Sequence, residues 1–142
     1  MKRTLASVFI LGFVLAIGCG PKGPELGEVE GIITLDGEPV PDAVITYVPM
    51  FPDGVECKSS DKTDANGYYR IRYNRERYGV KLGEYMVQAS TRDEVRQLDG
   101  SKKFIREVIP KVYWSIESPV IVNVEAGKND LNLEMFTDPD DR

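Results

Sequence analysis

The feature that most constrains the fold of this chain is a period of two in its apolar residues, which runs from residue 29 to residue 135. Side chains of a β-strand point alternately to the two faces of a sheet, so this period predicts strands with one buried face. Glycine, proline and Asx residues interrupt the pattern at turns, and no segment has the spacing of an amphipathic helix. The predicted strands lie at residues 29–35, 43–48, 68–73, 84–90, 120–124 and 131–135.

These runs predict an all-β chain that forms a single antiparallel β-sandwich of about seven strands. Residues 127–130 contain turn residues between the last two strands, which we expect to pair as a C-terminal hairpin. Tyr69, Tyr73 and Tyr85 fall on the apolar side of their strands and are expected in the core. A domain of this size buries enough surface to be stable without disulfides or a structural metal.

The N-terminus has the organisation of a secretion signal. Lys2 and Arg3 precede an apolar run at residues 5–17, which is shorter than the roughly 20 residues of a membrane-spanning helix. The run ends in Leu-Ala-Ile-Gly-Cys, which resembles the bacterial lipobox, although an alanine stands where leucine is usual. We therefore expect residues 1–18 to be a lipoprotein signal peptide and Cys19 to carry the lipid.

Two alternatives stay open for this segment, an ordinary secretory signal and a retained membrane helix. A lipid anchor with several acyl chains, palmitate among them, holds a protein stably because each buried CH₂ contributes about 0.8 kcal/mol.

Residues 19–27 are rich in glycine and proline and predict a flexible tether. Gly20 stands where aspartate marks retention in the inner membrane, so we expect an extracytoplasmic position on the outer membrane, or on the cell membrane of a cell with only one.

The composition disfavours several classes of function. The chain has no histidine, which removes the commonest general base and metal ligand. Its net charge is −5 and becomes −7 when Lys2 and Arg3 leave with the signal, so nucleic acid is disfavoured as a partner. With Cys19 lipidated, Cys57 has no intramolecular partner. We expect Cys57 to be buried as a small apolar residue, or else to pair between molecules.

Three segments carry a resemblance to a known family. Residues 31–49 contain Gly-x-Pro and Ala-x-Val, residues 62–71 contain Thr-Asp-x-x-Gly before an aromatic strand, and residues 82–90 contain Gly-x-Tyr-x-Val. In this order they resemble the carboxypeptidase-regulatory-like domain of the transthyretin-like (prealbumin-like) group. Residues 108–135, with Ile-Pro-x-x-Tyr, resemble the end of small bacterial lipoproteins built on that domain.

The resemblance implies a transthyretin-like or immunoglobulin-like sandwich at residues 28–136, followed by an acidic tail at residues 137–142. It also implies an accessory or binding module and carries over no catalytic residues. The same fold hosts a hydrolase of 5-hydroxyisourate that depends on histidines, which this chain lacks. A catalytic triad with a serine nucleophile is disfavoured for the same reason, because its general base is a histidine.

Two groups of acidic residues have both a functional and a structural interpretation. Asp61, Asp64 and Asn66 precede a glycine, as oxygen ligands do in calcium loops. Asx residues before glycine more often cap a turn, so we expect a turn and no metal. Asp93 and Glu94 are a possible catalytic pair, but adjacent acids in a charged stretch are usually solvated surface.

Residues 92–112 break the strand period and carry charges of both signs, which predicts a long surface connection between strands. If the domain has a partner, this segment is the expected contact surface. Tyr68 and Tyr78 are further aromatic residues that are possible exposed anchors. The expected contact residues are Arg96, Lys102, Lys103, Tyr113 and Trp114.

The leading hypothesis is a non-enzymatic, membrane-anchored extracytoplasmic lipoprotein that serves the cell envelope as an accessory or binding module. Its partners would be the membrane, through the lipid on Cys19, and an envelope protein or polysaccharide. No cofactor is expected. The alternatives are a structural subunit that self-associates through exposed sheet edges, and an enzyme of unknown type.

Overall fold

The computed structural model describes residues 23–50 and 58–138, and these form an all-β, sandwich-like domain. The described residues contain twelve strands and one helix of four residues. The elements in chain order are β1 (Leu26–Leu35), β2 (Glu38–Pro39), β3 (Val44–Pro49), β4 (Ser59–Lys62), β5 (Tyr68–Arg70), β6 (Val80–Lys81), β7 (Gly83–Ser90), β8 (Asp93–Arg96), β9 (Lys102–Ile105), α1 (Lys111–Trp114), β10 (Ile121–Val124), β11 (Gly127–Asp130) and β12 (Leu133–Met135).

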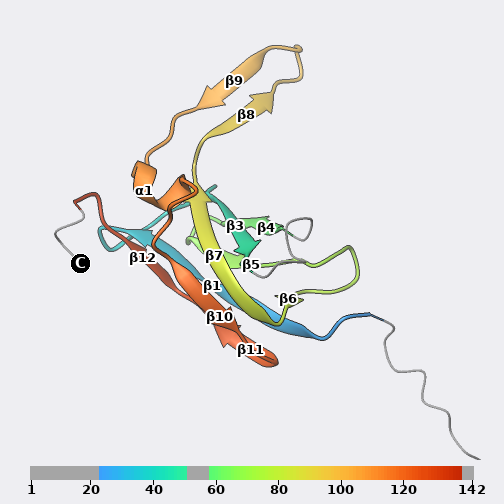
Figure 1. Cartoon of the computed structure of the whole chain (residues 1–142). Helices are drawn as coiled ribbons and strands as arrows, with labels where there is room; N and C mark the ends of the chain where they lie inside the picture. The colour runs from blue at the N-terminus through green and yellow to red at the C-terminus, as the bar shows by residue number, and fades with distance from the viewer. Residues whose placement is uncertain (1–22, 51–57, 139–142) are drawn as a thin grey trace, which may run out of the picture.

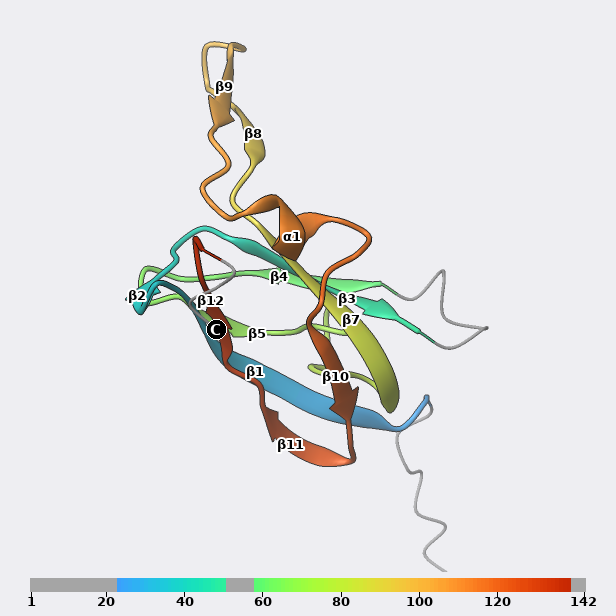
Figure 2. The same ribbon diagram turned by 60° about the vertical axis from the view of Figure 1, so that its left-hand side comes forward.

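Ten of these strands form two sheets that face one another (Figure 1). The first is organised around β1, which pairs with β2, β5 and β6 along one edge and with β11 and β12 along the other. The second has the order β10-β7-β3-β4 and is antiparallel throughout. Figure 2 shows β1 in one layer and β3 and β7 in the other.

The core lies between the two sheets and is built from alternate residues of the strands, as the period of two predicts. Tyr47 and Tyr85 enter it from the second sheet, and Tyr69 enters from the first. The hydroxyl groups of Tyr47 and Tyr69 lie 2.9 Å apart, and the rings of Tyr47 and Tyr85 meet edge to face at 5.8 Å. Hydrogen-bonded tyrosines therefore join the two layers at their centre.

The expectation of a C-terminal hairpin is wrong. The strand β10 joins the second sheet beside β7, whereas β12 joins the first sheet beside β1. Residues 127–130, expected as a turn, are the strand β11, which also pairs with β1. Both pairings with β1 are parallel, so the sheets are not purely antiparallel. Alternation shows which face of a strand is buried, but it does not show which strand lies beside it.

Two further expectations differ from the structure. Tyr73 lies beyond the end of β5 and is half-buried, outside the core. Residues 92–112 are not an unstructured connection, since they contain the hairpin β8–β9 and the first half of α1. Both faces of this hairpin are largely exposed and carry charged and apolar residues together, which is why its strands show no alternation of apolar residues.

The predicted signal peptide at residues 1–18, Cys19 and Cys57 lie outside the described residues, as do residues 139–142. Within residues 23–50 and 58–138, no helix is long and apolar enough to span a membrane.

Candidate interaction site

The hairpin β8–β9 extends from the sandwich as a separate arm (Figures 1 and 2). It forms a sheet of two strands, in which Asp93 lies opposite Ile105 and Arg96 lies opposite Lys102. We call residues 92–106 the arm. A hairpin of two strands has little stability of its own in water. The contacts at the two ends of the arm therefore decide whether it keeps its shape.

The tip of the arm is a tight turn at residues 97–101. The N–H of Gln97 donates to the carbonyl of Ser101 at 2.8 Å, and the N–H of Gly100 donates to the carbonyl of Gln97 at 3.0 Å. Gly100 has a φ of +84°, which glycine adopts without strain. Asp99 accepts the N–H of Ser101, and hydrogen bonds from that residue hold the pKa of the Asp99 carboxyl below its ordinary value. The turn thus fixes the strands of the arm in register.

Apolar side chains are exposed along the arm. Leu98 is fully exposed at the tip, Phe104 is 72% exposed on β9, and Val95 is exposed on β8. The arm also carries five basic and three acidic residues, a net charge of +2 in a chain of net charge −5. Val95 and Phe104 lie on opposite faces of the hairpin, so the arm presents apolar side chains on both faces and at its tip.

The base of the arm is fixed by the carboxylate of Glu107. This carboxylate accepts hydrogen bonds from the hydroxyl of Ser90, from the N–H and hydroxyl of Thr91, and from the N–H groups of Arg92 and Ile109. Burial opposes ionisation, but the hydrogen bonds from Ser90, Thr91 and Ile109 outweigh it and lower the pKa of Glu107. A single side chain thereby connects the end of β7 to the chain that returns from the arm.

Three of the expected contact residues, Arg96, Lys102 and Lys103, lie on the arm and are exposed. The other two lie on α1, which packs against β7 at the base of the arm. Tyr113 is only 3% exposed and its hydroxyl accepts the N–H of Phe136 at 3.1 Å, so its assignment as an exposed contact is wrong. It points into the core because α1 closes one end of the sandwich.

Trp114 is 37% exposed and borders a hollow of about 210 Å³ at the base of the arm. Its indole N–H donates to the carbonyl of Ile109 at 3.1 Å, which holds the ring in place. Arg92, the first residue of the arm, borders the same hollow. The remaining lining residues come from the neighbouring strands β3 and β7 and are Val44, Thr46, Gln88, Ala89 and Ser90.

Val95, Leu98, Phe104 and Glu107 were not among the contact residues expected from the sequence. The dipeptide Asp99-Gly100, with short polar and apolar runs on each side, is a hairpin signal that points to the arm. No pattern in the sequence marks Glu107, because its partners at residues 90–92 are brought to it only by the fold.

The acidic pair Asp93 and Glu94 is held in ion pairs. Asp93 lies 3.3 Å from the ammonium of Lys62, and Glu94 lies 2.7 Å from that of Lys102. Residues opposite one another in this hairpin share a face, and those next to one another alternate. The carboxylates of Asp93 and Glu94 therefore lie on opposite faces of the arm and do not converge on one point.

The acidic residues before Gly67 form a turn. Asp64 accepts the N–H groups of Asn66 and Tyr68 at 2.8 and 3.0 Å, and Asp61 accepts the N–H of Arg70 at 3.1 Å. The contacts of Asp64 are those of an Asx turn, whereas the contact of Asp61 joins β4 to β5. In the described part of the chain, no group of three or more His, Cys, Asp and Glu side chains is placed to hold a metal ion.

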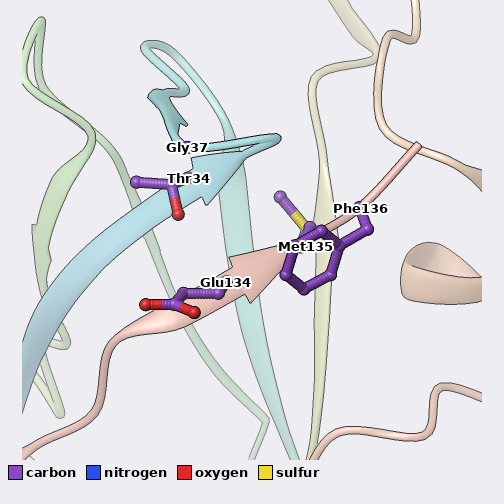
Figure 3. A pocket seen from close by; sticks show the side chains of 5 residues that line it. All are labelled: Thr34, Gly37, Glu134, Met135 and Phe136. Atoms are coloured by element: carbon purple, nitrogen blue, oxygen red, sulfur yellow. The ribbon is translucent and has the colours of Figure 1, made fainter. Parts of the chain in front are cut away.

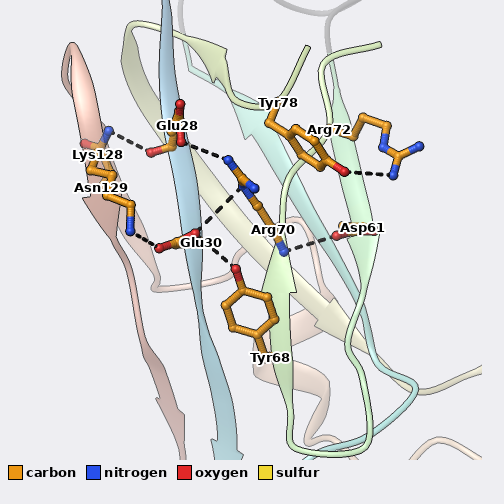
Figure 4. A network of polar contacts seen from close by, with 9 residues as sticks. All are labelled: Glu28, Glu30, Asp61, Tyr68, Arg70, Arg72, Tyr78, Lys128 and Asn129. Atoms are coloured by element: carbon orange, nitrogen blue, oxygen red, sulfur yellow. Dashed lines mark hydrogen bonds and ion pairs between the residues drawn. The ribbon is translucent and has the colours of Figure 1, made fainter. Parts of the chain in front are cut away.

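A network of charged and aromatic side chains covers the outer face of the first sheet (Figure 4). Tyr68 donates to Glu30, and Arg70 lies 3.0 Å from Glu28. Hydrogen bonds from Lys128 and Tyr68 lower the pKa of Glu30. The ring of Tyr78, the second expected anchor, lies 4.3 Å beneath the guanidinium of Arg70. Both tyrosines are partly exposed, but each is engaged within its own sheet face.

Two hollows lie beside β12. One of about 240 Å³ is bordered by Glu134 and Phe136 together with Thr34 and Gly37 (Figure 3). The other, of about 380 Å³, shares Glu134 and Phe136 and is otherwise bordered by Tyr113 and by residues 119–120. Neither gathers several polar groups around one point, as a catalytic site requires.

No protein-family model matches this chain, and no curated protein matches it. A solved structure of which a part is similar to this chain is that of a 9R-lipoxygenase from Cyanothece PCC8801. The identity is 13% and the TM-score is 0.44 over 97% of this chain. This chain spans only 19% of the lipoxygenase. A likeness of this degree carries no argument about fold or function.

Proposed function

We propose that this protein is a non-enzymatic lipoprotein, anchored outside the cytoplasm by lipid on Cys19, which contacts another envelope component through its arm. The observation that carries the proposal is the arm itself, a shaped hairpin outside the sandwich that exposes Leu98 and Phe104. A domain that only needed to fold would gain nothing by exposing these side chains. Phe104 and the basic residue Arg96 favour a protein partner, with polysaccharide as the alternative, because phenylalanine and arginine are enriched in protein interfaces.

The position of the arm fits an anchored protein. The strand β1 begins at Leu26, at the end of the sandwich away from the arm (Figures 1 and 2). Residues 19–25 would connect a lipid on Cys19 to this end, and seven residues reach at most roughly 25 Å. The arm would then point away from the membrane that holds the lipid, towards partners in the space beyond.

The absence of histidine from the sequence and the ion pairing of Asp93 and Glu94 support a non-enzymatic role. The proposal includes the resemblance to the carboxypeptidase-regulatory-like domain, because a residue of its motifs makes structural hydrogen bonds in this fold. The hydroxyl of Thr63 donates to the carbonyl of Val40 and accepts the N–H of Ala43, and both contacts are buried. These bonds position the turn that leads into β5.

Site-specific photo-crosslinking in cells tests the role of the arm. The full-length protein would carry a photoreactive amino acid at position 98 or 104, with a matched control at the exposed Glu76 on a loop of the first sheet. We expect protein adducts from both arm positions and none from the control. A lack of adducts at both arm positions would reject the arm as the interaction element.

A shortened arm provides the second control. Replacing residues 96–103 by Gly-Ser should leave the sandwich folded, because the arm forms a sheet of its own. Each halving of the length of a flexible loop changes the free energy of closing it by only about 0.6 kcal/mol. Loss of cooperative unfolding in this variant would show that the arm belongs to the core of the fold.

A further inference from the structure

We propose that the partner of the arm is a second copy of this chain, and that the free edge of β8 pairs with β8 of that copy in an antiparallel sheet. The inference rests on the proposed function of the arm and names its partner. It follows from which backbone groups of β8 face away from β9, and from the order of side chains along that strand.

The hydrogen bonds of the arm determine which backbone groups face outward. The N–H of Gln97 points to β9, since it donates to the carbonyl of Ser101. Backbone groups of successive residues in a strand point to opposite edges, so Val95 also faces β9. The N–H and C=O groups of Glu94 and Arg96 therefore face the edge of β8 that lies away from β9. The N–H of Glu94 donates there to the carboxylate of Asp93 at 2.8 Å, and pairing with a further strand would replace this exposed contact. A further strand would bond to these two residues.

Only one register suits both the hydrogen bonds and the charges. In an antiparallel pair of identical strands, the outward-facing residues must lie opposite one another. Glu94 then faces Glu94, or Arg96 faces Arg96, or Glu94 of each chain faces Arg96 of the other. The first two place like charges together, whereas the third forms two pairs of opposite charge. In the third register Val95 meets Val95 of the second copy at the twofold axis.

The other edge of the arm opposes such pairing. On β9 the outward-facing residues are Lys102 and Phe104, by the same alternation. Each register that joins these residues to their copies places basic side chains opposite one another, for example Lys103 against Lys103. Lysines on an edge strand prevent edge-to-edge association. The arm is thus protected along β9 and open along β8.

Pairing through β8 would also account for the exposed side chains of the arm. Two arms joined in this way form a sheet of four strands, which is more stable than a hairpin of two. In the same register Leu98 lies opposite Arg92 of the second copy. Arg92 borders the hollow beside Trp114 at the base of the arm. The exposed tip of each arm would therefore meet the hollow beside Trp114 of the other chain.

Disulfide crosslinking of the full-length protein in membranes tests the register. Val95→Cys would be made in a Cys57→Ser background, with Glu76→Cys as the exposed control. Residues opposite one another at a position without ladder hydrogen bonds have Cα atoms about 4.5 Å apart, which suits a disulfide. Mild oxidation should give a covalent dimer from Val95→Cys and none from Glu76→Cys. Absence of the dimer, or equal dimer from both variants, would overturn the proposal.

Charge exchange tests the pairing independently of cysteine chemistry. Glu94→Arg should weaken dimerisation at least roughly tenfold, because two attractive pairs become repulsive. The double variant Glu94→Arg/Arg96→Glu should restore it, and there the new glutamate lies opposite Lys102, which preserves the hairpin. Glu76→Arg should have no effect. Sedimentation of the full-length protein in detergent measures each change, and failure of the double variant to restore dimers would contradict the register.

The experiments separate this inference from the proposed function. Photo-crosslinked adducts of a different protein at positions 98 and 104, without a Val95→Cys dimer, would reject self-pairing and retain the arm as an interaction element. Adducts whose mass is twice that of the chain, together with the disulfide dimer, would support both. If neither probe reports a contact at the arm, both proposals fail.

Discussion

Removal of the Glu107 carboxylate should loosen the arm and destabilise the domain. In Glu107→Ala, the N–H groups of Thr91 and Ile109 lose their acceptor, and both residues are buried. A hydrogen bond to a charged group contributes about 1.5–3 kcal/mol net, and an orphaned buried N–H costs about 1–3 kcal/mol. Glu107 itself is only half-buried, so water replaces part of what is lost. We therefore expect a loss of roughly 2–4 kcal/mol in the free energy of unfolding.

For a domain of this size, such a loss lowers the melting temperature by roughly 8–15 °C. Thermal unfolding followed by circular dichroism measures this change, and Glu76→Ala, on an exposed loop, is the control. Hydrogen exchange should show that amides of the arm lose protection before those of the sandwich. A melting temperature within about 2 °C of the wild-type value would refute the assignment of Glu107 as the residue that fixes the arm.

The same carboxylate predicts a dependence on pH. The pKa of Glu107 is lowered in the folded protein, although burial opposes this, by hydrogen bonds from Ser90, Thr91 and Ile109. Its contribution to stability is therefore present above the ordinary pKa of 4.5 and is lost as the pH falls through the lowered value. Glu107→Gln should flatten this acidic part of the stability curve. Urea unfolding at a series of pH values measures this change. If the free energy of unfolding of Glu107→Gln falls as steeply at acidic pH as that of the wild type, the expectation is contradicted.

Three further predictions concern other parts of the chain. Gly67→Val should lower the free energy of unfolding by about 2 kcal/mol or more, because φ at this residue is +73° and a Cβ would lie 2.5 Å from the carbonyl oxygen of Ile33. Thermal unfolding measures this, and an unchanged melting temperature would contradict it. Burial raises the pKa of Tyr69 to about 12 and also raises the pKa of Tyr47, so the free energy of unfolding should be full below pH 10 and fall as the pH rises towards 12. Tyr69→Phe should make this fall less steep in denaturant unfolding. An equally steep fall in the variant would count against the role of Tyr69. Cys19→Ser should release the protein from membranes or leave the precursor uncut, and unchanged fractionation and mass would reject the lipid anchor.

Much of the sandwich is readable from local sequence. Alternation locates β1, β3 and β7 because one face of each is buried against the opposite sheet, and Tyr69 and Tyr85 were assigned to the core on this ground. The turn before β5 follows from Asp64 and Gly67, since an Asx cap and a positive φ are properties of a few adjacent residues.

The candidate site was only partly predictable. Arg96, Lys102 and Lys103 were placed in a charged surface segment, and the structure puts them on an exposed hairpin. That the segment forms strands was missed, because neither face of the arm is buried and so no apolar period results. Tyr113 was expected on the surface and is buried instead, since one turn of helix against β7 directs it inward.

The all-β character, the buried faces of the main strands and the turn before β5 follow from local sequence, because each depends on residues that are neighbours in the chain. That β10 and β12 belong to different sheets, and that β11 and β12 run parallel to β1, is seen only in the folded domain. The contact of Glu107 that joins the arm to the end of β7 is likewise seen only there. These features depend on which distant segments meet, and a period of two is equally compatible with any neighbouring strand.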